Sequence, residues 1–101
     1  MLERLYFVYI LASRPGGAIY IGVTSNLIKR VYEHVHELVK GHTSSYNIKR
    51  LVYYEIHHDI NEAILREKRL KKWTRAMKND LIGKHNPLWE DLYPKLLATA
   101  N

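Results

Sequence analysis

Two short apolar runs, joined by a loop that contains proline and glycine, constrain the fold of this chain more than any other feature. The runs are "FVYIL" at residues 7–11 and "IYIG" at residues 19–22, with "SRPGG" between them. Aromatic and β-branched residues favour strands, and proline and glycine favour the turn that joins them. We therefore predict a β-hairpin with strands over about residues 5–12 and 19–23.

The register of this hairpin brings two tyrosines onto one face. If the loop centres on its Pro-Gly pair, Tyr9 lies opposite Gly22 and Leu11 lies opposite Tyr20. Side chains alternate between the two faces of a strand, so Tyr9, Tyr20 and Gly22 share a face. Gly22 is expected to leave an open patch beside Tyr9, where a ligand backbone can approach closely. A packed pair of aromatic rings is the alternative interpretation.

Helical periodicity and capping residues predict the rest of the fold. The expected elements are a helix from the "TSN" cap to about Lys40, a strand over Leu51–His57, a helix from near "DINE" to Lys72 or beyond, a helix over Arg75–Gly83 and a short helical segment after Pro87. The order β-β-α-β-α-α predicts an α+β fold, a small three-stranded, mainly antiparallel sheet packed with helices. We expect a single domain over residues 1–101, with a core over about 5–93 and a C-terminal helical tail over 87–101.

The charge balance favours nucleic acid as a partner. Sixteen Lys and Arg residues against ten Asp and Glu residues give a formal charge of +6 and a pI near 9.6. Neutralisation of phosphates drives the binding of such proteins to nucleic acids. Seven of the cations fall in one predicted helical stretch: Arg66, Lys68, Arg69, Lys71, Lys72, Arg75 and Lys78.

Two absences from the sequence bound the class of protein. The chain has no cysteine, which excludes a disulfide framework and a thiolate metal site and fits a reducing cytoplasm. No apolar run approaches the ~18 residues that span a bilayer. We therefore expect a soluble, cytoplasmic protein with no membrane partner.

The first predicted helix carries an arginine and a histidine on one face. Arg30 and His34 are four residues apart and therefore neighbours on the helix surface. They lie at the edge of the apolar stripe formed by Leu27, Val31, Val35 and Leu38. Such a pair suits the binding of an anion, and a solvated basic edge is the alternative.

Glu67 stands out in the second predicted helix. It falls in the middle of the expected buried stripe, which consists of Ile60, Ala63, Ile64, Leu70 and Thr74. A carboxylate on a core face is costly unless it is paired or holds a metal ion. Glu67 therefore either bonds to a buried cation from another element, such as Arg30, or ligates a divalent ion. One carboxylate with several retained waters is a common way to hold Mg²⁺.

Taken together, these residues resemble the GIY-YIG nuclease family, in its small single-domain bacterial members. "FVY" (7–9) stands where the family has Gly-Ile-Tyr, and "YIG" (20–22) matches the second motif. "TSNLIKRVYEH", "AILREKRLKKW" and "NPLWEDL" follow at matching separations, so that the resemblance covers about residues 5–93. Phe7 and Val8 in place of Gly-Ile are a departure that affects packing at the sheet.

This resemblance implies phosphodiester hydrolysis with one divalent metal ion. Tyr9 would act as general base or orient the attacking water, His34 would accept or relay the proton, and Tyr20 would position the phosphate or the water. A free phenol, with a pKa near 10, is a poor base at neutral pH. The resemblance therefore implies that the metal and Arg30 lower the pKa of Tyr9.

The same resemblance assigns the remaining roles. Arg30 would stabilise charge on the phosphoryl oxygens, and Glu67 would hold Mg²⁺, or Mn²⁺, against the leaving oxygen. Asn86 would contribute a hydrogen bond near the phosphate. The products would be a 5′-phosphate and a 3′-hydroxyl. Trp73 and Tyr46 are candidates for stacking on unpaired bases, with core packing as the alternative for Trp73.

Three classes of function are compatible with these features. The first is a Mg²⁺-dependent DNA endonuclease acting on branched, damaged or single-stranded DNA, as in DNA repair. The second is a nucleic-acid-binding module with little intrinsic cleavage, which needs a partner protein. The third is an interaction adaptor, for example a homodimer formed through Trp89, Leu92, Leu96 and Leu97. We expect the chain to have no room for a separate module that recognises the target.

Overall fold

The computed structural model describes residues 4–38, 41 and 46–99. Within them lie the strands β1 (Tyr6–Ala12), β2 (Ile19–Thr24) and β3 (Arg50–His57) and the helices α1 (Leu27–Val35), α3 (Ile60–Lys72), α4 (Arg75–His85) and α5 (Tyr93–Thr99). The predicted α+β class and the antiparallel three-stranded sheet are confirmed. In the described ranges, no helix is both long and apolar enough to cross a membrane.

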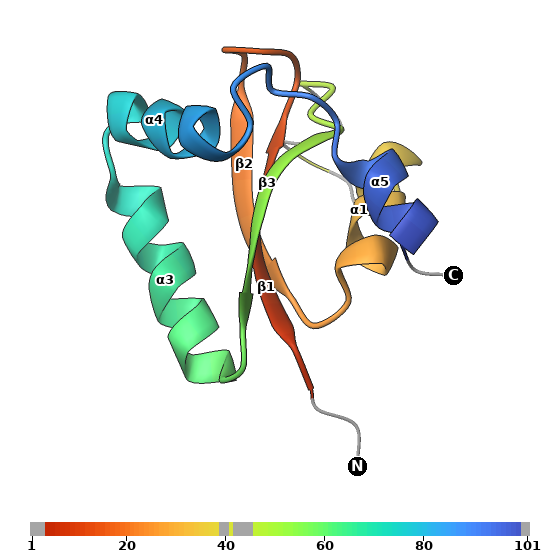
Figure 1. Cartoon of the computed structure of the whole chain (residues 1–101), viewed down its shortest axis with the longest axis vertical. Helices are drawn as coiled ribbons and strands as arrows, with labels where there is room; N and C mark the ends of the chain where they lie inside the picture. Colours follow the sequence, from red (N-terminus) through yellow and green to blue (C-terminus); the bar gives the residue numbers. More distant parts are fainter. Residues whose placement is uncertain (1–3, 39–40, 42–45, 100–101) are drawn as a thin grey trace.

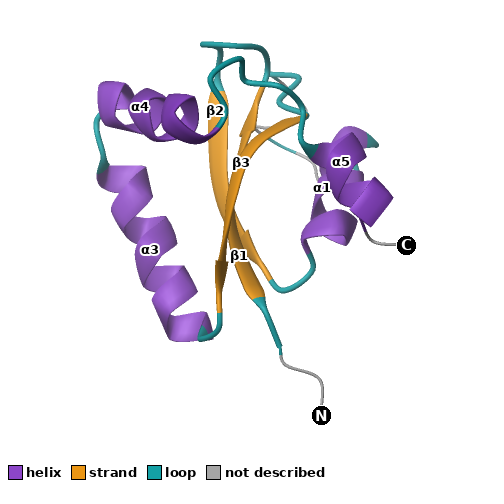
Figure 2. Cartoon of the chain, in the orientation of Figure 1, coloured by secondary structure: helices purple, strands orange, loops and turns teal. Residues whose placement is uncertain are grey.

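The sheet forms the middle layer of the protein. Its strand order is β2-β1-β3, with β1 antiparallel to both neighbours. Figure 1 shows α3 and α4 against one face and α1 and α5 against the other, and Figure 2 shows the same three layers by secondary structure. Helices cover both faces, so the central strand is buried without alternation from Val8 to Ala12.

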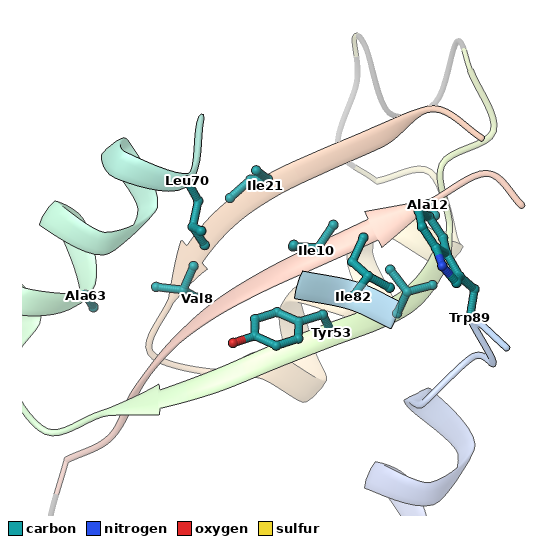
Figure 3. Close-up of a cluster of buried hydrophobic side chains, with 10 residues drawn as sticks. Val8, Ile10, Ala12, Ile21, Tyr53, Ala63, Leu70, Ile82 and Trp89 are labelled. Atoms are coloured by element: carbon teal, nitrogen blue, oxygen red, sulfur yellow. The ribbon is translucent and has the colours of Figure 1, made fainter. Parts of the chain in front are cut away.

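Each face of the sheet has its own hydrophobic core. The α3/α4 face buries Val8, Ile10, Ala12, Ile21, Val52, Tyr53, Ala63, Leu70, Ile82 and Trp89 (Figure 3). The α1/α5 face buries Tyr9, Leu11, Leu27, Val31, Ile48 and Leu51. Alternate residues of β1 thus support two separate clusters, and Tyr9 belongs to the one that contains α1.

The segment 86–92 crosses from the α4 face to the α5 face at the start of β3. Trp89 packs in the first core, Leu92 packs against the second, and the Leu92 amide donates to the Leu51 carbonyl at 2.8 Å. Asp91 Oδ1 accepts from the Leu51 amide at 3.2 Å. Helix α5 begins at Tyr93, so the short helical segment predicted after Pro87 is present, and residues 87–92 of the predicted helical tail are not helical. Residues 100 and 101 of the predicted tail lie outside the described residues.

Helix α1 ends earlier than predicted. It stops at Val35, and the predicted end near Lys40 is wrong. The Leu38 amide donates to the Glu33 carbonyl at 2.8 Å and the Glu37 amide donates to the His34 carbonyl at 3.2 Å, which is the Schellman arrangement at a helix end. Glu37 has the required left-handed conformation, with φ of 56°. Leu38 consequently lies outside the helix and is 65% exposed, so it is not part of the buried stripe.

Replacing Glu37 by glycine should stabilise the protein. A residue with a Cβ pays about 1 kcal/mol in the left-handed region, which glycine does not. We expect Glu37→Gly to raise the free energy of unfolding by about that amount in urea denaturation. The substitution also removes a 3.7 Å ion pair to Lys49. Lys49→Gln, which breaks the pair alone, is the control, and a Glu37→Gly protein no more stable than wild type would contradict the backbone argument.

Candidate functional site

The hairpin register is as predicted, but Gly22 serves a different purpose. Tyr9 pairs with Gly22 and Leu11 with Tyr20 across β1 and β2. The Tyr9 ring lies directly over Gly22, so that a Cβ at position 22 would be 2.5 Å from the Tyr9 Oη. The expected open patch for a ligand backbone is therefore wrong, because the phenol of Tyr9 itself occupies the space.

His34 meets the hydroxyl group of Tyr9 inside the protein. Its side chain is 3% exposed, and its Nε2 lies 3.3 Å from the Tyr9 Oη. The Tyr20 ring completes the group, with its centroid 5.4 Å from that of His34 and 6.3 Å from that of Tyr9. The sequence placed His34 at the edge of the apolar stripe, whereas the structure makes it one of the three buried residues of α1.

The surroundings of Tyr9 and His34 raise the pKa of the tyrosine and lower the pKa of the histidine. Burial, followed by the neighbouring Tyr20, raises the pKa of Tyr9, and Arg30 opposes the shift without cancelling it. Burial and the charge of Arg30 lower the pKa of His34. At neutral pH the phenol is therefore protonated and the imidazole neutral, and in the tautomer that leaves Nε2 unprotonated Tyr9 donates and His34 accepts. Burial outweighs the lowering effect of Arg30 on the pKa of Tyr9, and the expected lowering by a metal ion together with Arg30 stays a prediction.

Arg30 lies between this buried group and solvent. Its side chain is 42% exposed, and its Nε is 3.3 Å from Glu33 Oε1, one turn along the same helix. An exposed pair of this kind contributes little to stability, about 0–1 kcal/mol. The guanidinium group is thus oriented by Glu33 and still accessible to an anion.

Helix α3 buries fewer residues than its sequence pattern predicted. Ala63 and Leu70 are buried and Ile64 is half-buried, whereas Ile60 and Thr74 are exposed. Thr74 caps the next helix by accepting from the Met77 amide at 3.2 Å, so the expected stripe is wrong at its two ends.

Glu67 is nearly covered, and its cation comes from its own helix. The side chain is 14% exposed, and Oε2 is 3.0 Å from the Lys71 ammonium group. The alternative in which Glu67 pairs with Arg30 is not supported, because Arg30 pairs with Glu33. The charge of Glu67 contributes to the raised pKa of Tyr9, so the two groups lie near each other although α3 and α1 cover opposite faces of the sheet.

The residues at Glu67 fit a sparsely liganded divalent ion. Among residues 4–38, 41 and 46–99, no three His, Cys, Asp or Glu side chains cluster as a metal cage. Mg²⁺ is commonly held by one or two carboxylates together with waters and substrate phosphates. Lys71 already places a cation on Oε2, and its side chain is 51% exposed, so it can be displaced. Glu67 is therefore suited to this kind of site.

The side chain of Asn86 is buried and makes three hydrogen bonds within the fold. Its Nδ2 donates to the carbonyl groups of Val52 at 3.0 Å and Glu90 at 2.9 Å, and its Oδ1 accepts from the Glu90 amide at 3.1 Å. The register between β1 and β3 shifts at Val52, which is the extra residue of a β-bulge. Asn86 thus binds the bulge and the crossing segment, and these contacts do not support a hydrogen bond to substrate phosphate.

Comparison with known proteins identifies the family. Residues 5–80 match the model of the GIY-YIG catalytic domain. The chain belongs to the GIY-YIG family. This is a nuclease family, with DNA as the implied substrate.

Relatives of the same small size include UPF0213 proteins from bacteria. The UPF0213 protein CPE1444 of Clostridium perfringens is 35% identical over 89 residues, covering 88% of this chain and 94% of the relative. The UPF0213 protein DP2720 of Desulfotalea psychrophila is 35% identical over 79 residues, covering 76% and 70%. The solution NMR structure of the UPF0213 protein BH0048 from Bacillus halodurans has a TM-score of 0.55 at 24% identity, covering 86% and 92%, and shows the same fold.

The departure from the GIY-YIG motif is accommodated by packing. Val8 is fully buried in the first core, and the half-buried Phe7 packs edge-on against Tyr54, with ring centroids 6.4 Å apart. Tyr9 keeps its place in the motif. The two substitutions thus alter contacts with the sheet and leave the Tyr9–His34 contact intact.

Much of the predicted basic stretch is used within the fold of this GIY-YIG domain. Arg75 donates to the carbonyl groups of Gly16 and Gly17 in the hairpin loop, and Lys78 donates to the Lys71 carbonyl at the end of α3. Lys71 pairs with Glu67. Exposed cations of the stretch that remain available to phosphates are Lys68, Arg69 and Lys72.

A polar network on β3, which sequence reasoning missed, accounts for Arg66. Glu55 accepts from Tyr53 at 2.6 Å and from Arg66 at 3.1 Å, and it lies 2.6 Å from His57 Nε2. Burial opposes ionisation of Glu55, but these hydrogen bonds outweigh it and lower its pKa. The available signal in the sequence was the spacing of Tyr53, Glu55 and His57, which are two residues apart along the strand and therefore share a face. Arg66 also lies over the ring of Trp73, at 5.2 Å, and Trp73 packs against the first core, which confirms the packing interpretation.

Alanine at position 22 should displace Tyr9. The new Cβ would lie 2.5 Å from Oη and 2.6 Å from Cζ, so the ring must move away from His34. We expect Gly22→Ala to cost about 1–3 kcal/mol in thermal or urea unfolding. Gly83→Ala is the matched control, because the space around Gly83 in α4 is open, and it should instead stabilise by about 0.5–1 kcal/mol. Equal stabilities for the two variants would contradict the assignment.

Burial of His34 should make stability depend on pH. Its pKa in the folded protein is below the ordinary value of 6.5. Below pH 6.5 the unfolded chain takes up a proton here before the folded protein does, so stability falls as the pH is lowered, by up to about 1.4 kcal/mol per unit. His34→Asn should flatten this part of the curve in urea unfolding across this range. His36→Asn, at an exposed position at the end of α1, should not, and identical curves for His34→Asn and wild type would refute the prediction.

Proposed function

We propose that this GIY-YIG protein is a metal-dependent endonuclease that hydrolyses DNA phosphodiester bonds. The observation that carries the proposal is the contact between a protonated phenol and a neutral, buried imidazole, Tyr9 and His34, beside an accessible arginine. Hydrolysis of a phosphodiester requires an acceptor for the proton of water and positive charge at the phosphoryl oxygens. The Tyr9–His34 pair offers the proton acceptor, and Arg30 beside it offers the positive charge.

The two pKa shifts suggest how the proton moves. Tyr9 alone is a poor base, because burial raises its pKa. His34 is neutral and can accept a proton at Nε2, 3.3 Å from the Tyr9 Oη. As water attacks phosphorus, its proton passes to the Tyr9 oxygen while the original hydroxyl proton of Tyr9 passes to His34. The bond from phosphorus to O3′ breaks, O3′ takes up a proton from solvent, and the products are a 5′-phosphate and a 3′-hydroxyl.

The remaining roles follow from charge and position. Arg30 faces solvent at the edge of the buried group and would bind the non-bridging phosphoryl oxygens. Tyr20 packs against both Tyr9 and His34, which orients the two rings and leaves its own hydroxyl to contact the water or the phosphate. Glu67 would hold Mg²⁺ or Mn²⁺, which supplies Lewis-acid stabilisation of the developing negative charge.

DNA with a branched, damaged or single-stranded region is the substrate class we favour. Lys68, Arg69 and Lys72 are exposed on the helix that carries Glu67, and the chain has a net charge of +6. Such cations contact phosphates without reading sequence. Binding should therefore weaken steeply with salt and vary with the shape of the DNA more than with its sequence.

A binding module that needs a partner protein is the second candidate. Two observations favour it: Lys71 already neutralises Glu67, and Asn86 is fully engaged within the fold. The homodimer interface considered from sequence receives less support. Trp89 is buried, and Leu92 and Leu96 pack against the second core, so of the four residues only Leu97, 41% exposed, is substantially open.

Loss of the Glu67 carboxylate should abolish cleavage and preserve DNA binding. We expect Glu67→Gln to lower Mg²⁺-dependent cleavage by at least about 100-fold on a labelled panel of single-stranded, duplex, flap and four-way-junction DNA. Glu62→Gln, at an exposed position of the same helix, should cleave like wild type.

The same panel separates the two candidate functions. Cleavage that requires Glu67 and a divalent ion supports the endonuclease. DNA binding without cleavage on every substrate, with Mn²⁺ as well as Mg²⁺ and equally in wild type and Glu67→Gln, would replace it with the binding module.

A further inference from the structure

A cavity of about 310 Å³ adjoins the candidate active site. It lies where the start of β1, the end of β2 and the helices α1 and α3 meet. Its wall includes two arginines, Arg4 and Arg30, the ring of Tyr6, the hydroxyl group of Ser25, and two isoleucines of α3, Ile60 and Ile64. None of these residues except Arg30 has a role in the chemistry proposed above.

Arg30 connects the cavity to the candidate active site. Arg30 borders both, since it faces the cavity and influences the pKa values of Tyr9 and His34. Ile60, Ile64 and Glu67 follow each other at helical spacing along one side of α3. A DNA strand whose phosphate lies at Arg30 and Glu67 would therefore continue directly into the cavity.

The chemistry of the wall matches a nucleotide better than a bare anion. Arg4 and Arg30 provide two guanidinium groups, which suit successive phosphates of a strand. Tyr6 and the two isoleucines provide an apolar and aromatic surface, which a phosphate does not need and a base does. Ile60 is 46% exposed, so its side chain is accessible to a ligand in the cavity. The volume is at the lower end for ligand pockets, enough for about one nucleotide.

We propose that this cavity holds one unpaired nucleotide of the substrate strand, next to the phosphate that is cleaved. Its base packs between Tyr6 and the two isoleucines, and Arg4 binds the phosphate on its far side. A base in a duplex is stacked and paired and must leave the stack to enter. The cavity would therefore select DNA with unpaired bases. This inference rests on the proposed function for the position of the cleaved phosphate, and on the cavity alone for the binding of a nucleotide.

Binding can be tested without cleavage. The ¹³C-labelled methyl signals of Ile60 and Ile64 in the wild-type protein would be followed by NMR during titration with the dinucleotide pTpT. Parallel titrations would use the abasic analogue of pTpT and inorganic phosphate. Ring currents from a stacked base shift nearby methyl signals, whereas a sugar or a phosphate has no ring to do so.

We expect pTpT to shift both isoleucine signals and to bind at least about fivefold more tightly than its abasic analogue. Ile60→Ala and Ile64→Ala should remove most of this difference. Leu65→Ala is the matched control, an exposed aliphatic residue next to Ile64 and outside the cavity. Ile60 is itself nearly half exposed, so its variant tests the cavity without weakening the core.

Arginine variants distinguish the contribution of the phosphate to binding from that of the base. Arg4→Ala should weaken pTpT and the abasic analogue by the same factor, about fivefold, whereas Arg14→Ala at the exposed hairpin loop should weaken neither. Equal affinities for pTpT and the abasic analogue, or isoleucine signals that respond to neither, would overturn the inference.

These outcomes are independent of nuclease activity. A protein that discriminates the base through Ile60 and Ile64 but cleaves no DNA would retain the nucleotide site and lose the proposed endonuclease. A protein that cleaves DNA in a Glu67-dependent manner but binds both dinucleotides equally would retain the endonuclease and lose the nucleotide site.

Discussion

The ring of Tyr9 lies across Gly22 on the neighbouring strand, and this contact determines where its hydroxyl group can be. Glycine is needed at position 22 for space, since any Cβ would collide with the ring. From there the hydroxyl group reaches His34 on α1, a helix that starts three residues after β2 ends. The Asn26 cap, whose side chain accepts from the Lys29 amide, fixes that start. Strand β2 thus provides the space at Gly22 for the Tyr9 ring and also sets the position of α1, which carries His34.

The sequence predicted the elements well and the exposure of individual residues less well. The hairpin register followed from side-chain alternation and the position of the loop, both of which are local. The end of α1 was missed because Glu37 adopts a left-handed conformation that composition does not signal. The hydrogen bonds of Asn86 within the fold were missed because their acceptor, the bulge at Val52, exists only once β1 and β3 pair. The candidate site residues came from the sequence pattern and the family resemblance, but the burial of His34 and the resulting order of pKa values required the packed structure.

Net charge is an incomplete guide to the candidate DNA-binding surface of this protein. Arg66 bonds Glu55 and covers Trp73, and Arg75 ties α4 to the carbonyl groups of the hairpin loop. These guanidinium groups serve as structural connections between layers, for which their planar fork of donors is suited. A cation's value for binding therefore depends on whether a carboxylate or carbonyl group within the fold already holds it.

The candidate site draws its groups from both layers of helices. Tyr9 and His34 belong to the core beneath α1 and α5, whereas Glu67 is carried by α3 on the opposite face, and the two sets lie near each other at the β2 side of the sheet. Neither core alone assembles the site. A chain in which one layer has folded and the other has not would hold the Tyr9–His34 contact or the Glu67 carboxylate, but never both. The candidate residues therefore come together only once both helical layers have packed against the sheet, so the layer that folds last completes the site.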